Sequence, residues 1–234
     1  MKFYGLLILF IGVTCAAYAQ PTGTRLKDKV ALITGAASGN GKAMATLFAS
    51  EGAKVMIADI NGEGAELVAE SLAGKGLSVA SVQADVTKEA DVKKMVDATL
   101  EKYGRIDILM NNAGVFDELL PVGEVSDELW DRVIATNLTA PMRGIRAVIP
   151  IFEKQGGGVI VNTASIAGFT GARGGGAAYV ASKHGIVGLT KNVAFNYKEK
   201  NIRCNAVAPG RVNTNLRTCL LYTSDAADDL IGVD

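Results

Sequence analysis

The sequence is poor in the residues that usually build metal sites and disulfide frameworks. It has one histidine, His184, and three cysteines. Cys15 and Cys219 lie near the two ends of the chain, and only Cys204 lies in its body. Cysteines spread in this way form no disulfide framework, and without a Cys/His cluster we expect no bound metal.

The chain also lacks a charge imbalance, an internal repeat and a low-complexity linker. Lys plus Arg and Asp plus Glu both number 24, so no basic excess is present to hold a phosphate backbone, and we expect no nucleic-acid partner. Of the 234 residues, 49% are hydrophobic, which is enough for a sizeable core. A single globular domain is therefore predicted.

The two ends of the chain differ from its body. Residues 1–19 contain an apolar run and end in AYA, the pattern of a secretory signal peptide. A membrane anchor and an unused upstream start codon are the alternatives, so secretory and cytoplasmic locations both stay open; once a signal is removed, no membrane association is expected. Residues 219–234 begin with CLLYTSDAADD, which resembles a translated sequencing adapter. We expect these residues to be a non-native tail that follows a domain spanning 26–218, and an ordinary acidic C-terminus is the alternative.

Short β-branched runs alternate with longer amphipathic segments from Asp28 onward. This alternation is typical of βαβ units that build a parallel sheet covered on both faces. We predict strands at 29–34, 54–58, 78–83, 106–110, 158–163 and 202–207, and helices near 40–51, 62–73, 88–103, 126–154 and 177–199. The predicted fold class is α/β, a Rossmann-like doubly wound sheet in three layers. We expect it to be truncated at the C-terminus, because the helices and final strand that usually follow are missing after Pro209.

A glycine-rich turn, TGAASGNG at 34–41, follows the first predicted strand and opens a helix. Its spacing, Gly-xxx-Gly-x-Gly, lets a pyrophosphate approach backbone amides at a helix N-terminus. The alternative is a purely structural turn. We predict that a dinucleotide contacts this turn at Gly35, Ser38, Gly39, Asn40 and Gly41.

The second strand ends in an aspartate that bears on the choice of dinucleotide. Asp59 lies about twenty residues beyond the glycines, beside Ile60, where a carboxylate can accept hydrogen bonds from the ribose hydroxyls of an adenosine. The same charge would repel a 2′-phosphate, so NAD is predicted and NADP is disfavoured. An ordinary strand-end cap is the alternative role for Asp59. Asp85 and Val86, after the third strand, are candidate contacts to the adenine.

Further motifs resemble the short-chain dehydrogenase/reductase family. NNAG occupies 111–114, YVASK occupies 179–183 and Pro-Gly occupies 209–210, in the order found in the family. The resemblance covers roughly 26–216. Within the family, the chain is similar to bacterial-type alcohol dehydrogenases, glucose dehydrogenases and 3-oxoacyl-carrier-protein reductases. It implies further cofactor contacts at Asn112, Ala113, Gly114, Tyr179, Lys183, Pro209, Gly210, Val212 and Thr214.

Tyr179 and Lys183 are four residues apart on a predicted helix, so both project from one face. A free tyrosine has a pKa near 10, and a neighbouring ammonium stabilises its phenolate. The resemblance implies that Tyr179 exchanges a proton with the substrate oxygen and that Lys183 also holds the nicotinamide ribose. It implies that Ser165 binds the same oxygen and that Asn137, at a helix distortion, lets the backbone hold a relay water. A strand-end cap for Ser165 and a satisfied polar residue at Asn137 are the alternatives.

These residues predict an NAD-dependent oxidoreductase that transfers a hydride between nicotinamide and a secondary alcohol or ketone. An NADPH-dependent 3-oxoacyl-carrier-protein reductase and a non-catalytic NAD-binding fragment remain alternatives. The expected partner is a small-molecule substrate, and we expect the full-length parent to be a homo-oligomer. Asn40 departs from the family pattern, in which this position is usually apolar, and its polar side chain is expected to loosen packing under the glycine turn. The glycine-rich segment 171–176 either sets substrate specificity or is slack.

Overall fold

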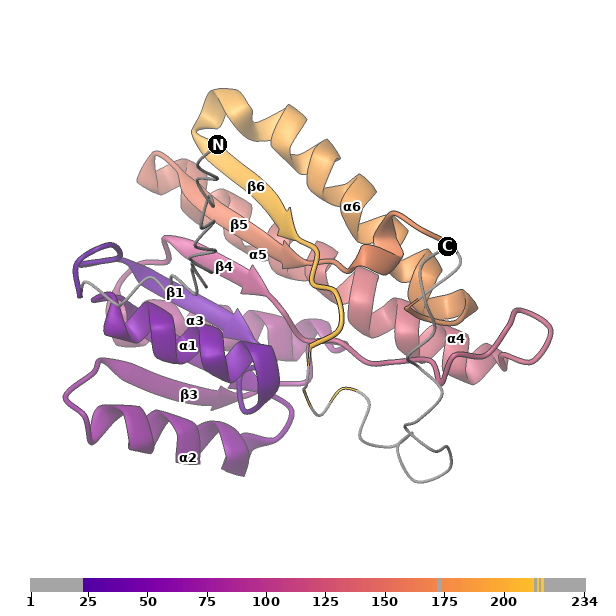
Figure 1. Cartoon of the computed structure of the whole chain (residues 1–234). Coiled ribbons are helices and arrows are strands. Elements are labelled where there is room, and N and C mark those ends of the chain that lie inside the picture. Colours follow the sequence, from indigo (N-terminus) through magenta and orange to yellow (C-terminus); the bar gives the residue numbers. More distant parts are fainter. Residues whose placement is uncertain (1–22, 172–173, 213, 215, 217–234) are drawn as a thin grey trace, which may run out of the picture.

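Six parallel strands form one sheet in the computed structural model, which describes residues 23–171, 174–212, 214 and 216 (Figure 1). The strands are β1 (Val30–Thr34), β2 (Lys54–Asp59), β3 (Val79–Gln83), β4 (Ile108–Asn111), β5 (Gly158–Thr163) and β6 (Ile202–Val207). Their order across the sheet is β3-β2-β1-β4-β5-β6. The central strand β1 pairs with two neighbours, so that Ile33 lies between Ile57 of β2 and Met110 of β4.

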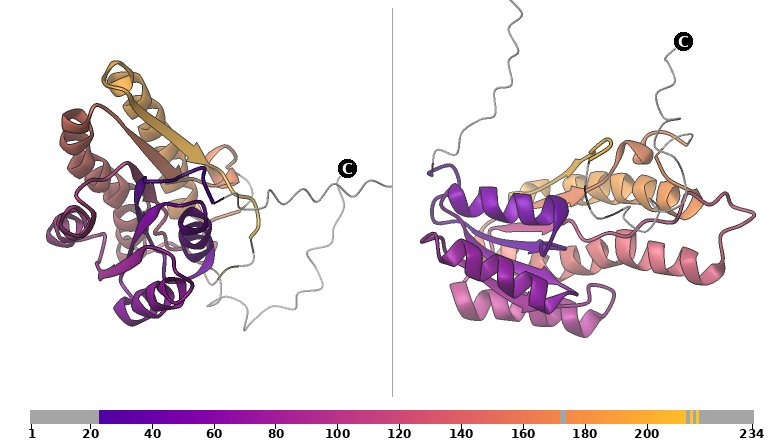
Figure 2. Two further views of the ribbon diagram at one scale, coloured as in Figure 1. Left: turned by 90° about the vertical axis from the view of Figure 1, so that its left-hand side faces the viewer. Right: turned by 60° about the horizontal axis from the view of Figure 1, so that its bottom comes forward.

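Helices cover both faces of the sheet (Figures 1 and 2). They are α1 (Gly39–Ser50), α2 (Gly62–Ala73), α3 (Glu89–Tyr103), α4 (Asp127–Ile134), α5 (Ala140–Gln155) and α6 (Ala177–Tyr197). The chain runs outward from β1 to β3 and then from β4 to β6, and right-handed crossovers in these two directions place helices on opposite faces. The predicted fold class, a doubly wound Rossmann-like sheet in three layers, is confirmed.

Two apolar clusters hold the layers together. All five residues of β1 are buried, and successive side chains point to opposite faces. Leu32 packs in one cluster with residues of α3, α5 and α6, including Phe152. Ile33 packs in the other with residues of α1 and α2, including Ala45. Burial on both faces is why residues 30–33 of this strand are all apolar, and the buried Thr34 that ends it is hydrogen-bonded.

Helix ends follow local signals in the sequence. In α3, Glu89 and Asp91 place negative charge in the first turn, where it complements the helix dipole. The helix ends at Gly104, which adopts the left-handed conformation (φ +78°), and its amide donates to the carbonyl of Leu100 at 2.7 Å. The ends of α3 therefore lie within a residue of those predicted.

The long helix predicted at 126–154 is divided by a π-helical turn at Ala135–Thr139. The amide of Ala140 donates to the carbonyl of Ala135, five residues earlier. Pro141 has no N–H and cannot donate the α-helical hydrogen bond to the carbonyl of Asn137, four residues before it. The helix predicted at 177–199 ends at Tyr197 and continues as the short 3₁₀ turn Lys198–Lys200.

The predicted signal peptide (1–19) and the predicted non-native tail (219–234) lie outside the described residues. Within the described part of the chain, none of the helices has the length and apolar character that crossing a membrane would require. The same part contains no group of His, Cys, Asp or Glu residues arranged to hold a metal ion.

Candidate active site

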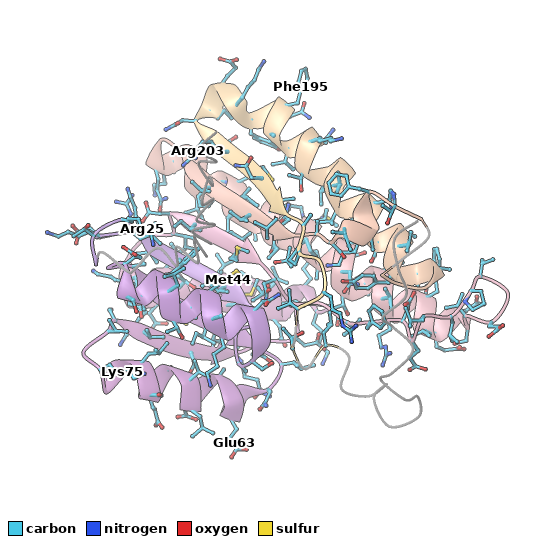
Figure 3. All side chains as sticks on the ribbon, in the orientation of Figure 1. Arg25, Met44, Glu63, Lys75, Phe195 and Arg203 are labelled. Carbon is cyan, nitrogen blue, oxygen red and sulfur yellow. The ribbon has the colours of Figure 1, made fainter. Side chains whose placement is uncertain are left out.

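A cavity of about 930 Å³ opens where β1, β4, β5 and β6 end. Chain connections diverge between β1 and β4, and ligands of doubly wound sheets bind at such a switch point. Lys75 and Arg203, labelled in Figure 3, lie at the other end of the sheet, where strands begin. Predicted site residues that line the cavity are Gly35, Ser38, Gly39, Asn40, Asn112, Gly114, Ser165, Tyr179, Lys183, Pro209, Gly210, Val212 and Thr214.

The glycine turn lies in direct contact with the loop after β4. Gly35 has φ +64°, and a Cβ there would lie 2.7 Å from Cα of Ala113. A Cβ on Gly41 would lie 2.0 Å from the carbonyl oxygen of Gly35. The first turn of α1 therefore packs against the start of the glycine turn with no room for a side chain. Asn40 lines the cavity. The close contact with Gly35 is made by its neighbour Gly41, and the loosening expected from Asn40 stays a prediction.

Asn112 ties the ends of three strands together. Its amide nitrogen Nδ2 donates to the carbonyls of Thr34 and Gly35 at 3.1 and 3.0 Å. Its Oδ1 accepts from the hydroxyl of Thr163 at 3.3 Å. Thr34 in turn accepts, through Oγ1, from the backbone amides of Asn112 and Ala113 at 3.0 and 3.1 Å. This network, which the motif alone did not predict, holds the glycine turn open toward the cavity.

Asp59 lies at the end of β2 and does not line the cavity. Its two oxygens accept from the backbone amides of Ala37 and Asn61, each at 2.9 Å. The capping role considered above is therefore present in the structure. It leaves further acceptor capacity, because an ionised carboxylate offers about four lone-pair sites. The neighbouring Ile60 is 65% exposed.

Asp85 and Val86 also lie outside the cavity. The carboxylate of Asp85 accepts from the hydroxyl and the amide of Thr87 at 2.7 and 3.0 Å. These bonds, with the hydroxyl bond as the largest cause, hold the pKa of Asp85 below its ordinary value. Val86 packs against the core cluster that contains Leu32, so it is part of the support beneath the site.

Tyr179 and Lys183 lie together on the buried side of α6. The ammonium Nζ of Lys183 lies 5.4 Å from the centroid of the Tyr179 ring and donates to the carbonyl of Thr163 at 2.7 Å. Lys183 is only 4% exposed, and burial lowers its pKa to about 8. The Tyr179 ring packs against Phe116, with centroids 4.8 Å apart. A phenol and an ammonium therefore face the cavity from one helical turn.

Ser165 follows β5 and lines the same cavity. Its Oγ accepts from the amide of Ala167 at 3.2 Å and caps the 3₁₀ turn Ile166–Gly168. A hydroxyl that accepts one bond still has its own hydrogen to donate. The capping role and the proposed contact with a substrate oxygen are therefore compatible.

Asn137 lies in the π-turn and is 2% exposed. Its Oδ1 accepts from the amide of Val115 at 2.8 Å, and its Nδ2 donates to the carbonyl of Val115 and to Oγ of Ser182 at 2.9 and 3.2 Å. The side chain is thus engaged with protein groups. Pro141 cannot provide the α-helical donor to the carbonyl of Asn137, and the relay water expected at this backbone stays a prediction.

Sequence patterns missed two further residues that contact Tyr179. Phe116 lines the cavity and contacts the tyrosine ring, and Asp117 is a fully buried carboxylate in the same loop. The glycine-rich segment 171–176 also contacts the tyrosine. A Cβ on Gly175 would lie 2.4 Å from Cδ1 of Tyr179. At least this part of the segment is packed tightly. Arg173 lies outside the described residues.

A doubly wound sheet with a glycine turn and a buried Tyr/Lys pair at its switch point defines a Rossmann-type oxidoreductase. The sequence model of the short chain dehydrogenase family matches residues 29–222. The chain belongs to this family.

Known relatives agree in sequence and in structure. The chain is 45% identical over 192 residues to 3beta-hydroxysteroid dehydrogenase 2 of Eggerthella lenta, covering 82% of this chain and 74% of the relative. Levodione reductase superposes with a TM-score of 0.80 at 39% identity, over 83% of this chain and 76% of the other. The 3-ketoacyl-(acyl-carrier-protein) reductase of Brucella melitensis, in complex with NADH, gives 0.78 at 40% identity, over 82% and 80%.

Proposed function

We propose that this protein is an NAD-dependent oxidoreductase that transfers a hydride between nicotinamide and a secondary alcohol or ketone. The observation that carries the proposal is one cavity lined both by the glycine turn, at Gly35 and Gly39, and by Tyr179, Lys183 and Ser165. Dinucleotide and reacting oxygen can therefore meet in one place.

The glycine turn fits a dinucleotide. Ser38 is the N-cap of α1, and within the described residues its side chain makes no capping hydrogen bond to the helix. The first amides of α1 can then face an anion, which the helix dipole favours. Asn112 and Gly114 would border the nicotinamide side, where Pro209, Gly210, Val212 and Thr214 also line the cavity. Asp59 would bind the adenosine ribose.

The polar groups above the sheet suit acid–base chemistry on an alcohol oxygen. Bound NAD would supply the hydride acceptor for oxidation, and its reduced form the donor for the reverse reaction. Tyr179 takes the proton from the substrate hydroxyl, or returns it to a carbonyl, and the ammonium of Lys183 stabilises the phenolate. Ser165 donates a hydrogen bond to the same oxygen. A water on the backbone at Asn137 would link Lys183 to solvent.

The substrate side of the cavity favours a bulky apolar alcohol. Phe116, Leu119 and Ile166 line it together with the tyrosine. Leu119 and Ile166 are 52% and 46% exposed, so apolar area there is available to a ligand. The similarity to a protein named for 3beta-hydroxysteroid oxidation supports the same size and polarity of substrate. The similarity to a 3-ketoacyl-(acyl-carrier-protein) reductase keeps an acyl-thioester substrate as the second candidate.

The test is a turnover assay that follows formation of reduced nicotinamide. We expect turnover with NAD, and a higher kcat/KM for hydroxysteroids than for short secondary alcohols, because the larger substrates bury more apolar area. Preference for NADPH with a 3-oxoacyl thioester would favour the carrier-protein reductase. NAD binding without turnover of any alcohol or ketone in either direction would contradict the proposal.

The choice of cofactor is tested at Asp59. We expect Asp59→Asn to reduce kcat/KM for NAD about tenfold or more, since hydrogen bonds from ribose hydroxyls to a charged acceptor are lost. The same variant should improve kcat/KM for NADP, because the repulsion of a 2′-phosphate is removed. The matched control is Asp85→Asn, at the end of the neighbouring strand, which should leave the NAD/NADP ratio nearer the original. An unchanged ratio in Asp59→Asn would argue against NAD selection by this carboxylate.

A further inference from the structure

The N-terminus of α6, the helix that carries Tyr179 and Lys183, has no cap of its own. Its N-cap residue is Gly176, in an extended conformation (φ −83°, ψ −169°) that would suit a capping serine or aspartate. A Cβ at Gly176 would lie 2.5 Å from the backbone N and O of Leu120. The helix therefore cannot carry a capping side chain at this position.

A buried carboxylate from the loop after β4 caps the helix instead. Asp117 is fully buried, and its Oδ1 accepts from the amide of Gly176 at 2.9 Å. Its Oδ2 accepts from the amide of Tyr179 at 2.7 Å. Asp117 thus caps, from 62 residues away, the helix turn that carries the phenol. Its negative charge is also favourable at a helix N-terminus.

The backbone next to Asp117 is arranged to make this contact. Glu118 and Leu119 both have positive φ, 61° and 62°, an unfavourable conformation for residues other than glycine. This tight turn brings Leu120 against the helix, where its carbonyl accepts from the amide of Ala177 at 2.9 Å. Such strain persists only where the surrounding structure holds it.

The same loop holds Tyr179 from its other side. The carbonyl of Tyr179 accepts from the hydroxyl of Ser182 at 2.7 Å, and Ser182 accepts from Nδ2 of Asn137. Asn137 binds both backbone groups of Val115, two residues before Asp117. Between these two residues, Phe116 packs on the tyrosine ring. Three consecutive loop residues are therefore linked to the backbone or the ring of Tyr179.

We infer that Asp117 is a positioning residue, which sets the place of the Tyr179 phenol relative to the cofactor and substrate by binding the Tyr179 backbone amide. The inference rests on the proposed function for its effect on turnover. The contact between Asp117 and the Tyr179 amide does not depend on the proposed function, because it joins two groups of the protein itself. The residue acts through Tyr179 and does not itself touch the cavity.

The test compares Asp117→Asn and Asp117→Ala with Asp107→Asn. Asp107 is a matched control: its carboxylate is also nearly buried and accepts from a backbone amide, that of Val30 at 2.9 Å, but it lies before β4 at the far end of the sheet. We expect kcat to fall about 10- to 100-fold in Asp117→Ala, because small misplacements of a reacting group have effects of this size. KM for NAD should stay nearly constant, and Asp117→Asn, which keeps one acceptor oxygen, should recover part of the loss.

Amide hydrogen exchange provides a second measurement that does not need turnover. We expect the Tyr179 amide to exchange about tenfold faster in Asp117→Ala, since its hydrogen bond to the carboxylate is lost, and to be unchanged in Asp107→Asn. Unchanged exchange at Tyr179, or wild-type kcat in folded Asp117→Ala, would overturn the inference. If the unsubstituted protein turns over no substrate while exchange responds as expected, the proposed function fails and the positioning contact stands.

Discussion

Replacing Tyr179 with phenylalanine is expected to lower turnover by about 10² to 10⁴-fold, the usual contribution of a general acid or base. The substitution removes only the hydroxyl, so the ring contact with Phe116 is kept and the helix stays in place. Binding of NADH, measured by fluorescence titration, should therefore be retained. Loss of turnover with retained binding separates a chemical role from a structural one.

The matched control for this prediction is Tyr197→Phe on the same helix. Tyr197 is the last residue of α6, and its ring lies 5.4 Å from Nζ of Lys200 and not at the cavity. We expect both turnover and NADH binding to be unchanged in this control. Undiminished turnover in Tyr179→Phe would refute the role of the phenol.

Lys183→Met is expected to abolish turnover and yet raise stability at neutral pH. Burial lowers the pKa of Lys183 from 10.5 to about 8, and such a fall corresponds to about 3 kcal/mol of unfavourable burial of the ammonium. Loss of the hydrogen bond to Thr163 offsets about 1 kcal/mol of the gain. A net increase of about 1 to 2 kcal/mol in the free energy of unfolding is expected, measured by urea denaturation without nucleotide.

The pH dependence of this stability difference gives the sharper check. The folded protein releases the Lys183 proton near pH 8 and the unfolded chain releases it near 10.5. Between these values the unfolded state binds more protons, so wild-type stability rises with pH relative to the variant. The advantage of Lys183→Met should be full below pH 8 and should be lost and reversed before pH 10.5, because the wild type regains about 3 kcal/mol over this range. Lys191→Met, an exposed site on the same helix, is the control, and a less stable Lys183→Met at pH 7 would contradict the prediction.

The strand pattern was predictable because each strand here has a local signature. Residues buried on two faces are mainly apolar, as at 30–33 in β1, and this pattern needs no knowledge of neighbouring strands. The π-turn at Ala135–Thr139 was expected only through the family resemblance, which implies a helix distortion at Asn137, and the helical pattern at 126–154 did not show it. Pro141 lacks the donor that an α-helix needs, but Pro150 lies inside the continuous helix α5, so a proline by itself does not mark where the predicted helix divides.

Only those parts of the site that lie within short sequence motifs could be predicted. The glycine turn and the Tyr179/Lys183 pair are each contained in one segment, and their placement after strands predicts a common edge of the sheet. Asp117 carries no such signal, because an aspartate in a polar loop and an aspartate under a helix N-terminus look alike in sequence. Its burial follows from the meeting of two loops about sixty residues apart.

By itself the sequence determined the doubly wound sheet, the glycine turn and the spacing of the phenol and the ammonium, because periodicity and steric demands of the backbone act over a few residues. Only the tertiary structure decided that Asn112 links three strand ends, that Asp117 caps α6 and that Lys183 is desolvated. These properties depend on which loops converge at the carboxyl edge, and that convergence is set by packing of the whole sheet.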